Sequence, residues 1–215
     1  MTAPTALSWF VVVPVRGRPE DKSRLHPHWG ERTPELAAAM AQDTVTACLE
    51  AVGSGHVIVV TQDSAWLASL LRDVALVADP GRGLDAAVRA GGVAARDLDR
   101  TCAVAVVLGD HPALHPVELS AALGAAAHHS RALVVDDAGT GTALLTAAPG
   151  MPLEAAFGTG SAERHQASGH VPLDGRWPGL RLDVDDVVAL AAAERLGVGA
   201  RTARVLRGVQ RRAGR

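Results

Sequence analysis

The feature that most constrains the fold is a regular alternation of short apolar runs with amphipathic segments. The run from Trp9 to Val15 is continuous and rich in β-branched residues, which is typical of a strand buried on both faces of a parallel sheet. The run from Cys102 to Leu108 is the most apolar and is expected at the centre. Because such runs alternate with helical patterns over short links, the sequence predicts one three-layer α/β domain over residues 1–215, with a mainly parallel sheet.

The boundaries of these elements follow from turn and capping residues. The expected strands cover residues 9–15, 56–61, 74–78, 102–108, 133–135, 142–146 and 180–184. Thr33 is expected to cap a long helix that has Pro34 at its first position and runs through Cys48. Further helices are expected from residue 63 or 64, over 85–96, from 116 through 123, from 161 through 165 and over 187–196. The basic tail, from about residue 204, is expected to fray.

Composition narrows the class of partner. The formal net charge is −2, so nothing in the balance asks for nucleic acid or an anionic membrane. The apolar run after Trp9 is too short for a secretory signal or a membrane span, and we expect a cytoplasmic protein. Cys48 and Cys102 are too few for a disulfide framework and are expected to be reduced core residues.

Ligands of open α/β sheets bind beyond the carboxyl ends of the strands, so the loops after the strands are the candidate sites. The first loop carries Arg16, Lys22 and Arg24, cations suited to phosphate oxygens, and Lys22 is the only lysine in the chain. The loop after the third strand holds Gly83 and Asp85 and opens a helix, where backbone N–H groups can meet a nucleotide. It is neither a Walker A loop nor a dinucleotide fingerprint. A solvated loop and an ordinary turn are the alternatives.

Carboxylates follow two other expected strands. Asp110 comes after the central strand and a glycine, a good place for Mg²⁺ beside a triphosphate. Asp183 and Asp185 alternate along the last expected strand, so both point to one face. If the end of that strand lies near Asp110, three acids gather, and like charges so close demand a cation or a shifted pKa. The alternative is a turn or helix-capping role, which is strong for Asp186.

Two polar loops complete the set. The loop before Thr142 offers a hydroxyl and exposed backbone, and the loop with Gly158 places Ser161 at a helix N-terminus, where anions bind. Each could be a plain turn. We find no Cys/His metal spacing and no Gly-x-Ser-x-Gly elbow, and we expect most of the nine histidines, including His111, to be surface or loop residues.

Together these segments resemble the 2-phospho-L-lactate guanylyltransferase family, which includes phosphoenolpyruvate guanylyltransferases of deazaflavin coenzyme F-420 biosynthesis. They occur in the family's order and cover almost the whole chain to about Ala203. The segments that carry the resemblance are 13–16 with 22–25, 108–114, 139–143, 157–165 and 177–185.

The resemblance implies a nucleotidyltransferase fold of the glycosyltransferase-A type and a Mg²⁺-dependent reaction. GTP and phosphoenolpyruvate or 2-phospholactate would give a guanylylated product and pyrophosphate. The family's metal acids fall on Asp110, Asp183 and Asp185, and its acceptor positions fall on Thr142, Gly158 and Ser161. Its basic loop falls on Arg16, Lys22 and Arg24, with Lys22 and Arg24 expected at the leaving pyrophosphate and Asp110 expected to be catalytic. The nucleotide-binding positions implied are Arg16, Lys22, Gly83 and Asp85.

Four positions depart from the family pattern. Arg16 stands where Lys is common, Asp85 where Asn is usual, Gly160 where Asp precedes the serine, and His111 where the family has an apolar residue. These departures leave open a related nucleotidyltransferase with another phosphoacid or nucleoside triphosphate, and a nucleotide-binding protein without activity. The choice of phosphoacid, a homodimer and a downstream transferase of the pathway as partner also stay open.

Overall fold

All the strands of the described chain belong to one sheet. The computed structural model describes residues 7–15, 22 and 24–213. Its strands are β1 (Trp9–Pro14), β2 (Val57–Thr61), β3 (Val74–Ala78), β4 (Ala103–Val107), β5 (Arg131–Val135), β6 (Thr142–Ala147) and β7 (Val171–Pro172). They lie in the order β3-β2-β1-β4-β6-β5-β7, and β6 alone runs antiparallel to its neighbours β4 and β5. The mainly parallel α/β sheet predicted from the sequence is therefore confirmed.

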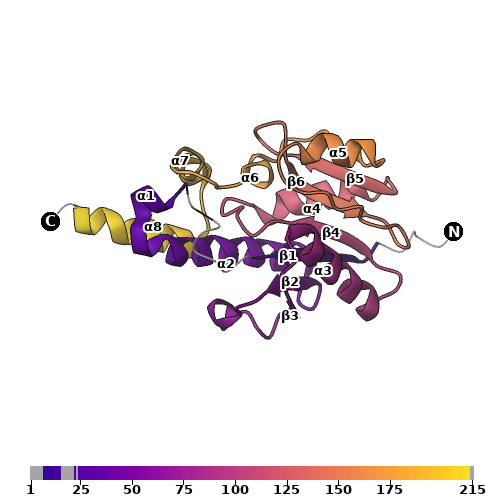
Figure 1. The fold of residues 1–215 in the computed structure, drawn as a ribbon, viewed down its shortest axis with the longest axis horizontal. Helices are drawn as coiled ribbons and strands as arrows, with labels where there is room; N and C mark the ends of the chain where they lie inside the picture. The colour runs from indigo at the N-terminus through magenta and orange to yellow at the C-terminus, as the bar shows by residue number, and fades with distance from the viewer. Residues whose placement is uncertain (1–6, 16–21, 23, 214–215) are drawn as a thin grey trace.

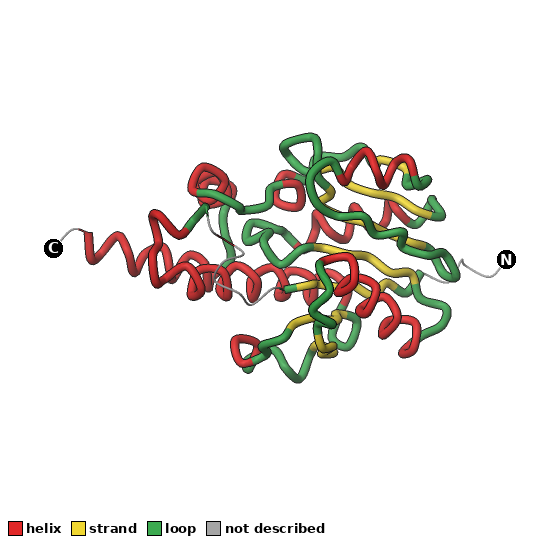
Figure 2. Tube along the Cα trace, viewed as in Figure 1, coloured by secondary structure: helices red, strands yellow, loops and turns green. Residues whose placement is uncertain are grey.

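Alternating side chains of the strands give the sheet two apolar faces. Val11 and Val13 of β1 pack toward α2 (Thr33–Val52) and α4 (Pro116–Ala126), whereas Phe10 and Val12 pack toward α3 (Leu84–Leu98). The short helix α5 (Ser161–Ala167) contributes Ala162 to the second face. Three layers result, with the sheet between helices, and Figures 1 and 2 show the helices on both sides of the strands.

A third apolar cluster lies away from the sheet, around the first half of α2. It joins α2 to α1 (His26–Trp29), α7 (Val187–Leu196) and α8 (Ala200–Ala213) through buried residues such as Met40, Leu190 and Leu206. In Figure 1 these helices gather on the left, beyond the strands. The remaining short elements are the 3-10 turns η2 (Gly30–Arg32) and η3 (Ala65–Leu67) and the helix α6 (Pro178–Arg181).

Asp43, in the middle of α2, fixes the start of α8. Its carboxylate is buried and accepts hydrogen bonds from the backbone N–H groups of Arg201 (3.2 Å) and Thr202 (2.7 Å). A carboxylate at a helix N-terminus satisfies free donors and meets the positive end of the helix dipole. A side chain on Gly199 would collide with Asp43, so a glycine is required beside this contact.

Several sequence expectations were wrong in detail. The chain from 180 to 184 is not a sheet strand: Pro178 starts α6, and the extended backbone that follows pairs with none of the strands described. The basic tail is helix α8, because its apolar side packs on α2 and α7. Thr33 does not cap α2; its hydroxyl donates to the carbonyl oxygen of Gly30 at 2.8 Å. The strand β7 and the short helix α1 had not been expected.

Two other expectations are confirmed. Cys48 and Cys102 are free and buried, and burial raises the pKa of the Cys48 thiol to about 12. No helix in the described part of the chain has the length and apolar character needed to cross a membrane.

We predict that Asp43→Ala lowers the free energy of unfolding by about 2 kcal/mol, because two charge-assisted hydrogen bonds at a helix N-terminus are lost. For a chain of this size that corresponds to a fall in Tm of roughly 4–8 °C, measurable by thermal unfolding followed by circular dichroism. The matched control is Glu50→Ala, an exposed acid near the end of the same helix, which should change stability by less than about 0.5 kcal/mol. Equal stability of the Asp43 variant and the parent would mean that apolar contacts alone hold α8.

Candidate active site

Asp110 stands at the carboxyl end of the central strand because the backbone there is held tightly. A Cβ on Gly109 would lie 2.9 Å from the side chain of Val15, so the turn after β4 packs directly on the end of β1. The N–H of His111 donates to the buried hydroxyl of Thr44 in α2 at 3.2 Å. These contacts fix the residues on both sides of Asp110.

Asp183 and Asp185 come to the same place on an extended segment. Leu182 and Val184 are buried in the third apolar cluster, so the alternating Asp183 and Asp185 point the other way. The N–H of Val184 donates to the carbonyl oxygen of Asp110 at 2.9 Å, which joins the segment to the turn after β4. The alternation predicted from sequence holds, although no strand forms. Carboxylate oxygens of Asp110, Asp183 and Asp185 lie within 4.8 Å of one another, a group able to hold a metal ion.

Lys22 lies among these acids. Its Nζ donates to Asp110 Oδ2 at 2.7 Å, to Asp185 Oδ1 at 2.6 Å and to the carbonyl oxygen of Val184 at 2.8 Å. Burial lowers the pKa of Lys22, but the carboxylates of Asp110 and Asp185 outweigh it and raise the pKa above its usual range. The lysine and the acids, which the sequence places in separate loops, therefore form one charged cluster.

The three acids differ in their electrostatic environment. Burial raises the pKa of Asp110, but Lys22 outweighs burial and holds that pKa below its usual value. The pKa of Asp183 is raised, first by burial and then by Asp110. Lys22 bonds to the other two carboxylates, and no described residue forms an ion pair with Asp183. Among the described residues, Asp183 is thus the acid of the cluster without a cationic partner.

A cleft of about 710 Å³ extends from the acids to the polar loops. Its lining brings together most of the side chains that the sequence singled out: Arg24, Asp110, Thr142, Gly158, Ser161, Asp183 and Asp185. Thr142 begins β6 and Ser161 begins α5, and their hydroxyl oxygens lie 3.1 Å apart. The loop through Gly158 is tied down by Arg164, which donates to the carbonyl oxygens of Ala156, Phe157 and Thr159.

The start of α3 borders the same cleft. Gly83 has a φ of 90° and precedes α3, and Leu84 lines both the cleft and an adjoining hollow of about 200 Å³ that also contains Lys22. Asp85 has a structural partner, because its Oδ1 accepts a hydrogen bond from the N–H of Phe157 at 2.8 Å. Arg16 lies outside the described residues.

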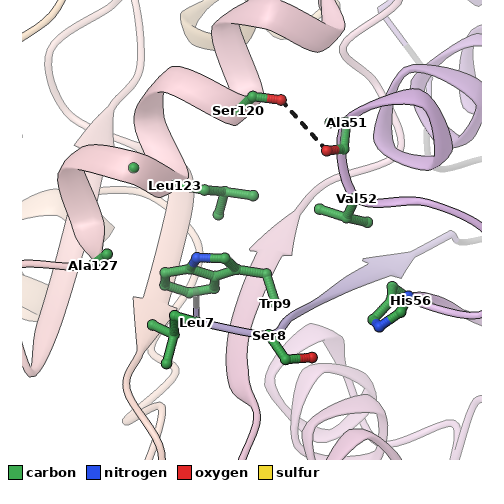
Figure 3. Close-up of a pocket in the computed structure, with 10 residues that line it drawn as sticks. Leu7, Ser8, Trp9, Ala51, Val52, His56, Ser120, Leu123 and Ala127 are labelled. Carbon is green, nitrogen blue, oxygen red and sulfur yellow. Dashed lines mark hydrogen bonds between the residues drawn. The ribbon is translucent and has the colours of Figure 1, made fainter. Parts of the chain in front are cut away.

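A second hollow, of about 410 Å³, lies at the opposite, amino end of β1 and β2 (Figure 3). Trp9, Val52 and Leu123 face it, and Ser120 at its rim donates a hydrogen bond to the carbonyl oxygen of Ala51. The described residues that line it include no carboxylate, lysine or arginine. The charged chemistry of the described chain is thus at the carboxyl edge of the sheet, as expected for this fold.

Sequence reasoning missed three buried histidines. His111 is only 1% exposed, lines the cleft and has Nε2 at 3.8 Å from Asp110 Oδ1. His165 is buried behind Thr142, and the buried ring of His170 lies beside that of His165, with the ring centroids 5.5 Å apart. The expectation holds for most of the nine histidines, because six are exposed or half-buried, and His111 does lie in a loop. It is wrong for His165 and His170, because isolated histidines give no periodic signal. The available clue was Arg164–His165, which begins three residues after the serine that starts α5.

Solved structures of other proteins share the fold of this chain. No protein-family model matches the chain. A nucleotidyl transferase from Methanothermobacter thermautotroptrophicus shares the fold with a TM-score of 0.59 at 19% identity, over 88% of this chain and 97% of that one. A protein from Mycobacterium tuberculosis H37Rv, solved in complex with manganese, gives a TM-score of 0.52 at 22% identity, over 86% and 97% of the two chains.

Curated relatives are much closer in sequence. The phosphoenolpyruvate guanylyltransferase of Geodermatophilus obscurus is 45% identical, with 96% of this chain and 98% of that protein aligned. That of Streptomyces scabiei is 46% identical, with 92% and 95% aligned. The identity extends over nearly the full length of both relatives, and the fold is that of a nucleotidyltransferase. The chain therefore belongs to the phosphoenolpyruvate guanylyltransferase family.

Proposed function

We propose that this protein transfers GMP from GTP to phosphoenolpyruvate and releases pyrophosphate, as a step of coenzyme F-420 biosynthesis. The observation that carries the proposal is the convergence of Asp110, Asp183 and Asp185 with Lys22 in a cleft that also reaches Thr142 and Ser161. One end of this cleft suits a metal-bound triphosphate, and the other suits a small anionic acceptor. The family membership supports the same reaction.

The residues present fit a divalent cation. The three acids offer only oxygen ligands, which Mg²⁺ and Mn²⁺ prefer, and Asp110 Oδ1 has no hydrogen-bond partner among the described residues. A structural neighbour from Mycobacterium tuberculosis H37Rv was solved in complex with manganese, which agrees with a divalent cation in a protein of this fold. We propose Mg²⁺ held by Asp110, Asp183 and Asp185, where it would neutralise charge on the phosphates.

The protein's own groups would then act by positioning and by charge. The acceptor's phosphate oxygen is already anionic, so the attack on the α-phosphorus of GTP needs no general base. Lys22 and Arg24, with Arg16, are assigned to the triphosphate and the leaving pyrophosphate. The backbone N–H groups that follow Gly83 are available to nucleotide oxygens, and Asp85 supports the loop at Phe157. Thr142, Gly158 and Ser161 are assigned to the acceptor.

The substrates of the proposed reaction are GTP and a small phosphoacid, with 2-phospholactate as the alternative acceptor. The protein would act as one catalytic domain in the cytoplasm, where GTP and phosphoenolpyruvate are found. The proposed reaction is compatible with a homodimer and with a downstream transferase that takes up the guanylylated product.

The experiment that tests the function is a pyrophosphate-release assay with a panel of substrates. GTP should be paired with phosphoenolpyruvate, 2-phospholactate and 3-phosphoglycerate, and each acceptor should be repeated with ATP and CTP. We expect the highest kcat/KM for GTP with phosphoenolpyruvate. Tight GTP binding without pyrophosphate release from any acceptor would overturn the proposal and favour a binding protein.

Asp110→Ala and Asp183→Ala should each abolish turnover, because each removes a ligand that the phosphates depend on. The loss should be at least 100-fold, on the order of 3 kcal/mol. The control is Asp97→Ala, an exposed acid on α3, which should keep full activity. Activity like that of the parent in either active-site variant would refute the metal assignment.

Lys22→Ala should lower kcat/KM for GTP at least tenfold, about 1.4 kcal/mol, because the only lysine in the cluster is lost. Steady-state kinetics with GTP as the varied substrate measures this. Arg72→Ala, which removes an exposed cation outside the cleft, serves as control and should have no effect. An unchanged kcat/KM in the lysine variant would reduce Lys22 to a structural ion-pair partner.

Asp183→Asn should stabilise the metal-free protein at pH 7, because it removes the carboxylate whose negative charge is not balanced. A raised pKa means that the folded state resists ionisation, so the penalty is complete at pH 7 and is relieved as pH falls toward the ordinary value of 3.8. The gain should appear as a higher Tm at pH 7, should shrink as the pH falls, and should be lost below the ordinary value of 3.8.

Thermal unfolding with and without MgCl₂ or MnCl₂ completes this test. The cation should raise the Tm of the parent protein but not that of the asparagine variant. A variant that is less stable without metal, or equally stabilised by it, would contradict the electrostatic account of Asp183.

A further inference from the structure

A buried chain of hydrogen bonds runs behind the polar end of the cleft. His165 is 0% exposed; its Nε2 accepts the backbone N–H of Ala156 at 2.9 Å, and its Nδ1 lies 2.9 Å from Thr142 Oγ1. Thr142 Oγ1 in turn lies 3.1 Å from Ser161 Oγ. The two hydroxyl residues line the cleft, whereas the imidazole lies behind them.

The backbone amide decides where the ring carries its proton. An N–H can only donate, so Nε2 must offer its lone pair, and a neutral ring then carries its hydrogen on Nδ1. Burial, together with His170 and Arg164, lowers the pKa of His165 to about 4, so the ring is neutral at physiological pH. Nδ1–H therefore donates to Thr142 Oγ1.

The tautomer determines what the hydroxyl pair presents to the cleft. With the hydrogen on Nδ1, Thr142 and Ser161 have two hydroxyl hydrogens, and the bond between them uses one. One hydrogen is left to donate to a ligand. With the hydrogen on Nε2, Thr142 would donate to the ring and Ser161 to Thr142. Only lone pairs would then remain, and these would repel an anion.

We infer that His165 is a positioning residue that turns the Thr142–Ser161 hydroxyl pair into a hydrogen-bond donor for an anionic oxygen of the acceptor substrate. The inference rests on the proposed function, because it requires the acceptor to occupy this end of the cleft. An oxygen of a carboxylate or of a phosphate satisfies the same geometry.

The same contact links the donor to the loop that borders the acceptor. The N–H of Ala156 sets the tautomer, and the carbonyl oxygen of the same residue accepts hydrogen bonds from Arg164. The N–H of the next residue, Phe157, donates to Asp85. The loop through Gly158 and the orientation of the hydroxyl pair are therefore fixed together. A displaced loop would release Nε2 and allow the other tautomer.

The direct test is the tautomer itself, observed by NMR of the full chain labelled with ¹⁵N-histidine. The spectrum of His165→Asn identifies the His165 signals by their absence. We expect a pyrrole-type Nδ1 and a pyridine-type Nε2 at neutral pH. The opposite assignment, or a protonated ring, would overturn the inference whether or not the enzyme is active.

The kinetic test uses two amides of different length. His165→Asn can place an amide nitrogen near the position of Nδ1 and keep the donor to Thr142, whereas His165→Gln reaches the position of Nε2 and loses it. We expect the KM for phosphoenolpyruvate to rise at least tenfold in the glutamine variant and less than threefold in the asparagine variant. The KM for GTP should be unchanged in both. Equal effects of the two variants, or a parallel rise in the KM for GTP, would overturn the inference.

A matched control and an analogue separate the remaining explanations. His170→Gln alters the neighbouring buried ring, which bonds to neither the Thr142 nor the Ser161 hydroxyl, and should leave the KM for phosphoenolpyruvate unchanged.

An acceptor analogue, vinyl phosphate, identifies the contacted group because it lacks the carboxylate of phosphoenolpyruvate. A penalty for His165→Gln that persists with vinyl phosphate assigns the contact to the phosphate, and a penalty that disappears assigns it to the carboxylate. Failure of the parent enzyme with every acceptor would refute the proposed function and leave the tautomer to be judged by NMR alone.

Discussion

Three carboxylates within 4.8 Å of one another repel, and the structure around the cleft depends on how that repulsion is contained. Asp110 is carried by the sheet, at the end of its central strand, and the other two acids are carried by the helical cluster beyond the sheet. Lys22 joins the two parts, because one ammonium group bonds to Asp110, to Asp185 and to the backbone between the acids. The geometry of the acids is thus a balance between apolar packing and one strongly paired cation.

The rest of the cleft is arranged by directional hydrogen bonds, most of them from side chains to backbone groups. Arg164 and Asp85 hold the loop around Gly158 through backbone groups, and His165 reaches both this loop and Thr142. Such contacts orient a site before a ligand arrives, which lowers the cost of binding. One end of the cleft is therefore set by electrostatics and the other by hydrogen-bond direction.

Much of this could be predicted from the sequence, and what could not has a common physical reason. Buried strands such as β1 and β4 can be predicted because they are continuous apolar runs. From Leu182 to Asp185, apolar and acidic side chains alternate between two faces as predicted, although no strand forms there. Lys22 and Asp110 are 88 residues apart, and no local pattern can show that they touch. The sequence of helix α8 predicts a fraying tail, because a basic, Arg-rich segment is typical of a solvated one; its burial depends on partners in α2 and α7. Burial of His165 likewise depends on partners from β6 and a distant loop.

The anchoring of α8 by Asp43 has a consequence for the whole cleft. No described residue of α8 lines it, yet Val205 and Leu206 share an apolar cluster with Leu182 and Val184, the residues that flank Asp183. The last helix thus supports the segment that carries Asp183 and Asp185 through apolar packing, and none of its described residues contacts the cleft itself. Shortening the chain before residue 200 would leave all the proposed active-site residues in the sequence while removing the packing that aims two of them. A change that loosens the packing of that helix would therefore displace Asp183 and Asp185 without altering any residue that lines the cleft.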